Sequence, residues 1–177
     1  MAERPVPDKR MKRGASISLD GVYRYRLTRR WGDDDGAAVT WVMLNPSTAD
    51  GTTDDPTIRR CVGFARSWGF DSLHVVNLFA FRATDPKALH TADDAVGPLN
   101  HRHVRLAIDM SAAVVCAWGA NAKKVPQYRH APNVRDIAGR TPTYCLGTTK
   151  DGSPRHPLYV KADTQLVRFW PEEVGRG

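Results

Sequence analysis

The chain has 177 residues, with 26 Lys and Arg against 19 Asp and Glu, so its formal net charge is +7. This length predicts one domain, whose hydrophobic core is large enough to be stable without a metal ion or a disulfide. A hydrophobic fraction of 41% and a charged fraction of 25% exclude wholesale disorder. No apolar run reaches the ~18–20 residues of a membrane helix. The basic N-terminus has no apolar stretch behind it, which excludes a secretory signal.

The positive charge favours a polyanionic partner, although a codon bias toward Arg in a GC-rich genome explains it equally well. The three cysteines, Cys61, Cys116 and Cys145, lie far apart and form no CxxC pair. The histidines show no metal-ligand spacing either, so we expect no metal and no cofactor. We expect such isolated cysteines to be reduced thiols in the protein core, which favours a cytoplasmic location.

The N-terminal part of the chain predicts two features. Residues 1–15 are typical of a flexible basic arm, and residues 16–177 of a single α/β domain. Residues 22–30 alternate apolar and basic side chains, as a half-exposed strand does. A turn signal at 32–36 and an apolar run at 38–44 then predict a hairpin that leads into a buried strand.

Strands and helices alternate beyond this hairpin. We predict further strands over residues 72–79, 112–118 and 142–146. We predict helices over residues 56–68 and 96–109, from Asn121 onward, and over 162–170. This alternation predicts an α/β three-layer sandwich, in which a mainly parallel central sheet is covered on both faces and preceded by the N-terminal hairpin.

Polar residues gather where the predicted strands end. Asn45 follows strand 38–44, Asn77 lies near the end of strand 72–79, and a polar loop over residues 147–157 follows strand 142–146. In an open α/β sheet, ligands bind beyond the carboxyl ends of the parallel strands. We therefore expect these groups to form one site, surrounded by the cations Lys123, Lys124, Lys150 and Arg155.

Four motifs occur in order at these ends: Met43-Leu44-Asn45-Pro46, Val75-Val76-Asn77-Leu78, a stretch from Trp118-Gly119 to Lys123-Lys124, and Gly152-Ser153-Pro154-Arg155-His156-Pro157. Over roughly residues 38–160 they resemble the motifs of the uracil-DNA glycosylase superfamily. The stretches NPSTAD, NLFAFRATDP and GSPRHPLY are also similar to an uncharacterised bacterial and phage family, carried only as a domain of unknown function. That second resemblance brings no established activity.

The first resemblance implies a DNA glycosylase-like hydrolase that acts on a modified or damaged base. Asn45 would orient water or the sugar, because an amide cannot act as a general base at neutral pH. Asn77 offers a donor and an acceptor in one plane, the pattern that pairs with a pyrimidine edge. The remaining candidates are Asp50 as a nearby carboxylate, His156 for the departing base anion, and Phe79 or Phe81 for stacking on the base.

Basic and hydroxyl side chains near the strand ends are candidates for phosphate contacts: Lys150, Ser153, Arg155, Arg59 and Arg82. The register of the last motif stays open. If Ser153-Pro154 aligns with the Ser-Pro of fast uracil enzymes, Asp151 takes the histidine position and would repel an anionic leaving group. If Pro154 to Pro157 is the working unit, His156 serves instead.

Two other functions remain open, because a fold does not fix a function. One is a nucleotide- or nucleoside-binding protein, or a base-modification protein, on the same scaffold. The other is a nucleic-acid-binding module without catalysis. In each case the expected partner is DNA or a nucleotide, and not a membrane. The sequence does not identify the target base or the oligomeric state. Turn, cap and core roles for Asn45, Asn77 and the phenylalanines are the ordinary alternatives.

Overall fold

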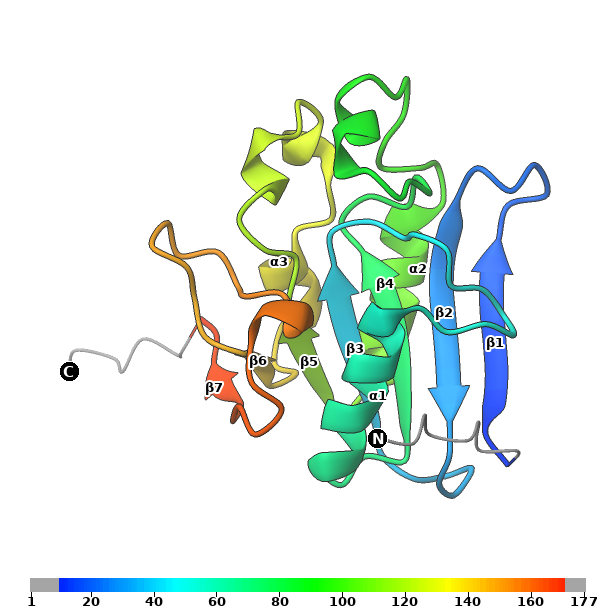
Figure 1. Ribbon diagram of the computed structural model, residues 1–177, viewed down its shortest axis with the longest axis vertical. Coiled ribbons are helices and arrows are strands. Elements are labelled where there is room, and N and C mark those ends of the chain that lie inside the picture. Colours follow the sequence, from blue (N-terminus) through cyan, green and yellow to red (C-terminus); the bar gives the residue numbers. More distant parts are fainter. Residues whose placement is uncertain (1–9, 171–177) are drawn as a thin grey trace, which may run out of the picture.

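A mixed sheet of seven strands forms the centre of the computed structural model, which describes residues 10–170 (Figure 1). The strands lie in the order β1-β2-β4-β3-β5-β6-β7. Parallel pairing is confined to β4-β3-β5-β6, and the three outer pairings are antiparallel. The α/β class is confirmed, and the sheet is mixed rather than mainly parallel. The strands are β1 (Lys12–Ile17), β2 (Arg24–Arg30), β3 (Ala38–Met43), β4 (Ser72–Asn77), β5 (Ala113–Cys116), β6 (Thr143–Cys145) and β7 (Val167–Arg168).

Helices cover the two faces of the sheet. On one face, α1 (Pro56–Ser67) packs Ile58 and Phe64 against Trp41 of β3. On the other, α2 (Asn100–Asp109) and α3 (Val134–Ala138) share a second core with β4 and β5. All residues of β3, β4 and β5 are buried, as expected for strands covered on both sides. Four short 3₁₀ turns complete the chain: η1 (Pro86–His90), η2 (Ala122–Lys124), η3 (Tyr128–His130) and η4 (Pro157–Tyr159).

The start of α1, expected at residue 56, carries two residue types that are typical of helix N-termini. The Asp55 side chain accepts a hydrogen bond from the Ile58 amide at 2.9 Å, and Pro56 occupies the first helical position. The cap fixes Asp55 at the end of the sheet where the polar groups were expected. The described residues contain no helix that is long and apolar enough to cross a membrane.

The predicted hairpin between residues 22–30 and 38–44 is wrong. β4 lies between β2 and β3, and Leu27 of β2 pairs antiparallel with Val75 of β4. The connecting loop is held by Asp71 at the start of β4: the Gly32 amide donates to the Asp71 carbonyl at 3.0 Å, and the Asp71 amide donates to the Ala37 carbonyl at 2.9 Å. Both ends of the loop therefore bind β4 rather than each other.

The true N-terminal hairpin joins β1 to β2. Residues 12–15 were predicted to be part of the flexible arm, but they belong to β1. The domain therefore begins before residue 16. Residues 1–9 of the arm lie outside the described residues. β1 pairs with β2 over its whole length, so the Arg-rich strand β2 is an internal strand of the sheet and not an edge.

Three predicted helices differ from the structure. α2 begins only at Asn100, because Gly97 turns the chain with a φ of +90°. The helix expected from Asn121 is replaced by η2 and η3, in a stretch interrupted by Pro126 and Pro132. The helix expected over 162–170 is wrong: the segment contains the short strand β7, which pairs with β6, and packs Leu166, Phe169 and Trp170 against the two cores.

Candidate functional site

A pocket of about 530 Å³ opens at the carboxyl ends of β3, β4 and β5. Asn45 after β3, Asn77 at the end of β4 and Trp118 after β5 lie on its wall, with Arg155 and His156 from the loop beyond β6. Since parallel strands end at the same edge, the order β4-β3-β5-β6 brings these residues together from distant parts of the sequence. The expected convergence of polar strand ends is thus present in the fold.

Asn77 is the most unusual group in this pocket. Its side chain is buried, with 1% of the residue exposed. Neither its Nδ2 nor its Oδ1 has a hydrogen-bond partner among the described residues. A buried polar group left without a partner costs ~1–3 kcal/mol. The amide therefore offers one donor and one acceptor that only a ligand or water in the pocket can pair.

Asn45 is held in place by its own amide. Its Nδ2 donates to the carbonyls of Pro46 at 3.1 Å and Ala83 at 2.9 Å. These two bonds use both amide protons and leave the carbonyl oxygen Oδ1 as the atom for a ligand. Asn45 can accept a hydrogen bond from a water or a sugar hydroxyl, but it does not donate one.

His156 presents a neutral ring to the pocket. Its Nδ1 accepts a hydrogen bond from the Leu158 amide at 3.2 Å, so the ring proton of the neutral form is on Nε2. Burial lowers the pKa of His156, and the charge of Asp55 opposes this effect. Nε2 is accordingly a hydrogen-bond donor near neutral pH, which suits an anionic group better than an acceptor would.

Two charged residues of the pocket wall were missed as site residues: Arg24 and Asp55. β2 runs antiparallel to β4, so Arg24 at its start lies beside the end of β4, where its amide donates to the Ala80 carbonyl at 3.0 Å. Between β1 and β2, Ser16 pairs with Arg26 and Ile17 with Arg24, which leaves Tyr25 as a bulge. The alternation of residues 22–30 indicated a strand but not this bulge, and Asp55 was not among the candidate site residues.

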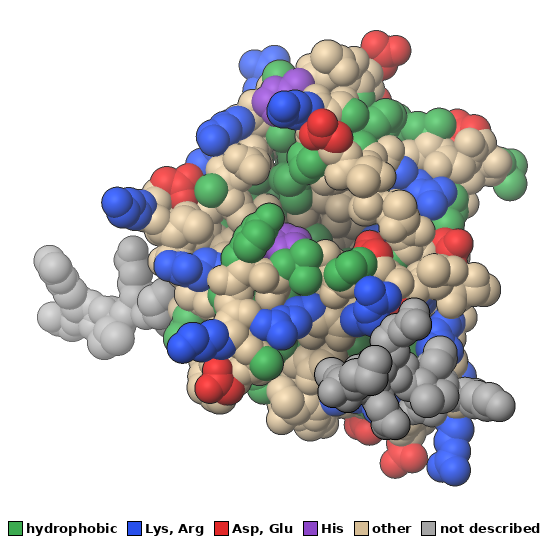
Figure 2. Space-filling view, viewed as in Figure 1, with side chains coloured by type: hydrophobic (Ala, Val, Ile, Leu, Met, Phe, Trp, Pro, Cys, Tyr) green, Lys and Arg blue, Asp and Glu red, His purple; other side chains and the backbone are tan. Residues whose placement is uncertain are grey.

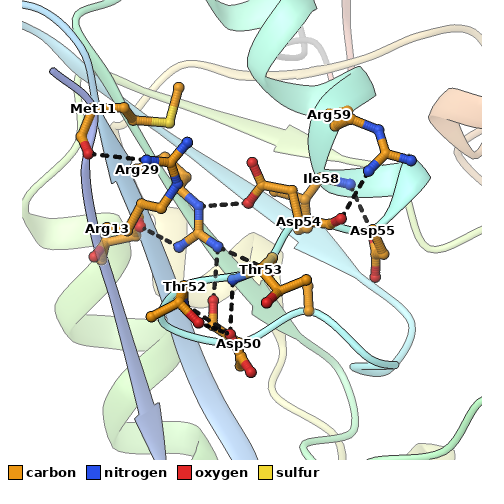
Figure 3. A network of polar contacts seen from close by, with 12 residues as sticks. Met11, Arg13, Arg29, Asp50, Thr52, Thr53, Asp54, Asp55, Ile58 and Arg59 are labelled. Carbon is orange, nitrogen blue, oxygen red and sulfur yellow. Dashed lines mark hydrogen bonds and ion pairs between the residues drawn. The ribbon is translucent and has the colours of Figure 1, made fainter. Parts of the chain in front are cut away.

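A polar network around Arg29 fixes the loop that carries Asp55 (Figure 3). Arg29 is fully buried, and its Nε forms an ion pair with Asp54 at 2.7 Å. Its Nη2 donates to the carbonyls of Asp50 at 2.7 Å and Thr53 at 3.3 Å. The Asp50 carboxylate accepts from the amides of Thr52 and Thr53, and these bonds lower its pKa. Asp50 therefore organises the loop and does not lie on the pocket wall.

The two aromatic candidates lie away from the pocket wall. Phe79 is fully buried in the core between the sheet and α2. Phe81 packs edge-to-face on Tyr23, with 6.2 Å between ring centroids. Neither ring lines the pocket, where the aromatic residues are Trp118 and Tyr159. The stacking role expected for Phe79 and Phe81 is corrected accordingly.

The loop after β6 carries both candidates for the histidine position, Asp151 and His156, and they differ in their contacts. Asp151 accepts hydrogen bonds from the hydroxyls of Thr149 and Ser153, which lower its pKa to about 2. The exposed carboxylate of Asp151 is thus bonded within the turn, to the buried Ser153 among others. His156 reaches the pocket wall and Asp151 does not.

Of the expected phosphate contacts, only Arg155 lines the pocket. Lys150 and Ser153 lie outside its wall, as do Arg59, which donates to the Asp54 carbonyl at 2.8 Å, and Arg82, which donates to the Gly21 carbonyl at 3.3 Å. Lys123 and Lys124 are exposed and also lie outside it. Figure 2 shows basic side chains spread over this face of the molecule. The expected ring of Lys123, Lys124, Lys150 and Arg155 is therefore reduced to Arg155.

The described residues contain no group of three or more His, Cys, Asp or Glu that could hold a metal ion. Comparison with known proteins gives one family: a model described as "Protein of unknown function (DUF1643)" matches residues 24–158. No curated protein and no solved structure matches the chain.

Proposed function

The chain belongs to the DUF1643 family, and from the residues of its pocket we propose that it is a DNA glycosylase-like hydrolase. In this proposal the pocket takes up a modified or damaged base flipped out of DNA, and the enzyme hydrolyses the N-glycosidic bond. The observation that carries the proposal is Asn77, whose buried amide has no partner among the described residues. A planar donor and acceptor on the wall of a pocket match the hydrogen-bonding edge of a base.

The surrounding residues supply the other parts of such a reaction. The bond between C1′ and the base nitrogen breaks, and its electron pair leaves with the base, where the Nε2 proton of His156 stabilises the negative charge. Water, oriented by Oδ1 of Asn45, forms the new bond to C1′. Asp55 is the carboxylate on the pocket wall and takes up the proton that the water loses.

The positions of the motifs support a finer relationship to the uracil-DNA glycosylase superfamily. Asn45, Asn77 and His156 lie at one end of a parallel β4-β3-β5-β6 core with helices on both faces. Arg155, on the border of the pocket, is the residue we propose for a DNA phosphate. A cytoplasmic location belongs to the same proposal, and the three buried, free cysteines support it.

A second candidate function is nucleotide binding without cleavage. It is favoured by Asn45, which stands after β3 where the fast uracil enzymes of the resembled superfamily have a catalytic Asp, and by Asp50, which is engaged with Thr52 and Thr53. In that case the same pocket would bind a free nucleotide and leave its glycosidic bond intact. Asn77 would read the base in either function.

Incubation with modified oligonucleotides separates the two candidates. The substrates carry uracil, hypoxanthine, hydroxymethyluracil or mismatched thymine, and alkali cleaves any abasic site that forms. We expect strand breaks with at least one base, and their loss in Asn45→Ala and Asn77→Leu. Gln165→Leu, which removes an exposed carboxamide outside the pocket, is the matched control and should cleave normally.

Two results would decide against a hydrolase. If no base gives breaks, while free nucleotides raise the melting temperature of the wild-type protein and not of Asn77→Leu, nucleotide binding is the function. If neither breaks nor a nucleotide-dependent shift appears, the pocket does not bind bases and both candidates are wrong.

A further inference from the structure

Arg24 is a buried cation on the pocket wall for which neither the resemblance nor the family gives a role. Only 2% of the residue is exposed. Its Nη1 donates to the Ala49 carbonyl at 2.6 Å, and this is its one side-chain hydrogen bond within the described residues. Its Nε is buried without a partner in that same region. A guanidinium has five N–H donors, so most of the donors of Arg24 are unpaired.

Arg29, on the same strand, shows how this protein normally satisfies a buried arginine. Arg29 pairs with Asp54 and donates to four backbone carbonyls. Arg24 has no carboxylate oxygen within 4 Å in the described part of the chain. Burying an unpaired charge is expensive, and removing a charge from water is tolerated when a partner compensates it. The difference between the two residues points to a partner that comes from outside the chain.

The charges near Arg24 leave it positive. Burial lowers its pKa to about 10, and Asp55 acts against this change while Arg82 and Arg29 add to it. The guanidinium therefore carries its charge at neutral pH. Asp55, the carboxylate with the largest effect on the pKa of Arg24, uses its Oδ1 to cap α1. An additional negative group in the pocket would meet Arg24 and the neutral Nε2–H of His156.

The sheet order places Arg24 next to the base-reading amide. β2 and β3 flank β4, so Arg24, Asn77 and Asn45 come from three adjacent strand ends. A ligand that pairs with Asn77 therefore has one side toward Arg24 and the other toward Asn45. The pocket volume of about 530 Å³ falls within the range of ~300–1,000 Å³ that is usual for small-ligand sites.

We propose that Arg24 forms an oxyanion subsite, and that the ligand read by Asn77 carries a carboxylate or phosphate beside the group that Asn77 pairs with. The inference deepens the proposed function, since it defines the substrate class as a base or nucleotide with an acidic group. The planar fork of arginine binds either oxyanion with two parallel hydrogen bonds. Phosphate and carboxylate share this chemistry and differ in the part of the nucleotide that supplies them.

Thermal melting and calorimetric titration of the full chain test this subsite. The probes are inorganic phosphate, neutral uridine, uridine 5′-monophosphate, and uracil-6-carboxylate. We expect at least one anionic probe to raise the melting temperature, and Arg24→Met to weaken its binding at least tenfold. Uridine binding should change less than threefold in Arg24→Met. Arg105→Met, which removes an exposed charge on α2, is the control for net charge and should bind every probe as the wild type does.

Binding of the monophosphate but not of uracil-6-carboxylate identifies a phosphate as the natural anion. Binding of uracil-6-carboxylate but not of the monophosphate identifies a nucleobase that carries a carboxylate. The proposal is overturned if no anion binds, or if Arg24→Met and wild type bind the anions equally. Arg24→Lys, which keeps the charge without the fork, gives a second test that is independent of how Arg24→Met folds, and should bind anions several-fold more weakly than wild type. Anion binding without uridine binding would contradict base reading by Asn77 while supporting the subsite, so the two proposals fail separately.

Discussion

Two buried asparagines lie side by side at the end of β4 and play opposite parts. Asn100 is fully buried, and its Nδ2 donates to the backbone carbonyls of Asn77 at 2.9 Å and Leu78 at 3.1 Å. Asn77 has the same side chain and the same burial, but its amide has no partner among the described residues. The first residue stabilises the turn after β4, whereas the second presents its amide to the pocket at a cost in stability.

This contrast predicts opposite effects of the same substitution. Asn77→Leu removes an unpaired buried amide and should raise the free energy of unfolding by ~1 kcal/mol. Asn100→Leu leaves two buried carbonyls unpaired, which outweighs the loss of its own unpartnered Oδ1, and should lower it by ~1–2 kcal/mol. Urea denaturation of both variants measures the difference. A destabilised Asn77→Leu would mean that an ordered water already pairs with the amide, so that Asn77 does not lack a partner in the folded protein.

His74, in the middle of β4, makes stability depend on pH. Burial, with Arg26 and Arg30 adding to it, lowers its pKa from 6.5 to about 4. Between these values the unfolded chain binds a proton that the folded protein does not, so stability falls as the pH falls from about 6.5 to about 4. The shift corresponds to a loss of roughly 3 kcal/mol over this range.

Urea denaturation at several pH values measures this loss. His74→Leu should reduce the fall in stability between pH 6.5 and 4 by most of that amount, whereas His101→Leu, at an exposed position on α2, should leave the wild-type pH dependence unchanged. The lowered pKa values of His103 and His156 act in the same direction, so the variant with His74 replaced keeps part of the slope. An unchanged slope in His74→Leu would contradict a neutral His74 in the folded protein.

At the scale of single residues, topology was predictable and side-chain direction was not. Asn45, Asn77 and His156 follow strands that end at one edge of the sheet, so their position could be predicted from the alternation of strands and helices. Phe79 lies only two residues beyond Asn77, yet it points into the core. Arg24 reaches the pocket because of the bulge at Tyr25, which no local sequence signal indicates.

At the scale of elements, the loop between β3 and α1 is held by one side chain. Arg29 connects β2 to residues 50–54 through an ion pair and two carbonyl contacts, and to β1 through the Gly14 carbonyl at 3.3 Å (Figure 3). The loop in turn places the cap residue Asp55 at the pocket. The shape of the site therefore depends on a residue that does not touch it.

Replacing Arg29 should be far more damaging than replacing Arg24. Arg29→Met leaves Asp54 and several carbonyls without their donor, and breaking such a buried pair costs ~3–5 kcal/mol. Arg24→Met removes one hydrogen bond and an unpaired charge, so its effect on unfolding should be small. Lys12→Met removes the exposed pair with Asp34 and should change nothing measurable. Equal destabilisation by Arg29→Met and Arg24→Met, in urea denaturation, would contradict the difference in their bonding.

The elements themselves show which sequence signals are sufficient. β3 and α1 were predicted within a residue or two, because an unbroken apolar run and an Asp-Pro start are local signals. The pairing of β2 could not be predicted in this way, because β2 pairs antiparallel with β4, some 45 residues away in the chain. The segment over 162–170 was expected to be a helix, but Val167 and Arg168 pair antiparallel with β6, and no local signal in the sequence indicates that pairing.

At the scale of the whole molecule, the sheet order sets a gradient of stability. β3 and β4 are buried on both faces and have a paired strand on each side. β1 and β7 are the two edges, and β7 has only two residues, both exposed. Burial and pairing both decrease outward, so local unfolding should begin at the edges and reach β3 and β4 last.

Native-state hydrogen exchange measures this gradient directly. Amides of β3, β4 and β5 should exchange only through global unfolding, those of β2 and β6 through smaller openings, and those of β1 and β7 fastest. The pocket would then combine a rigid floor, Asn77 at the end of β4, with a more mobile border, Arg155 and His156 beyond β6. A bound ligand should therefore slow exchange most over residues 147–160. If β1 exchanged as slowly as β3, its free edge would have to be covered by another chain, and the order of opening argued from this sheet would be wrong.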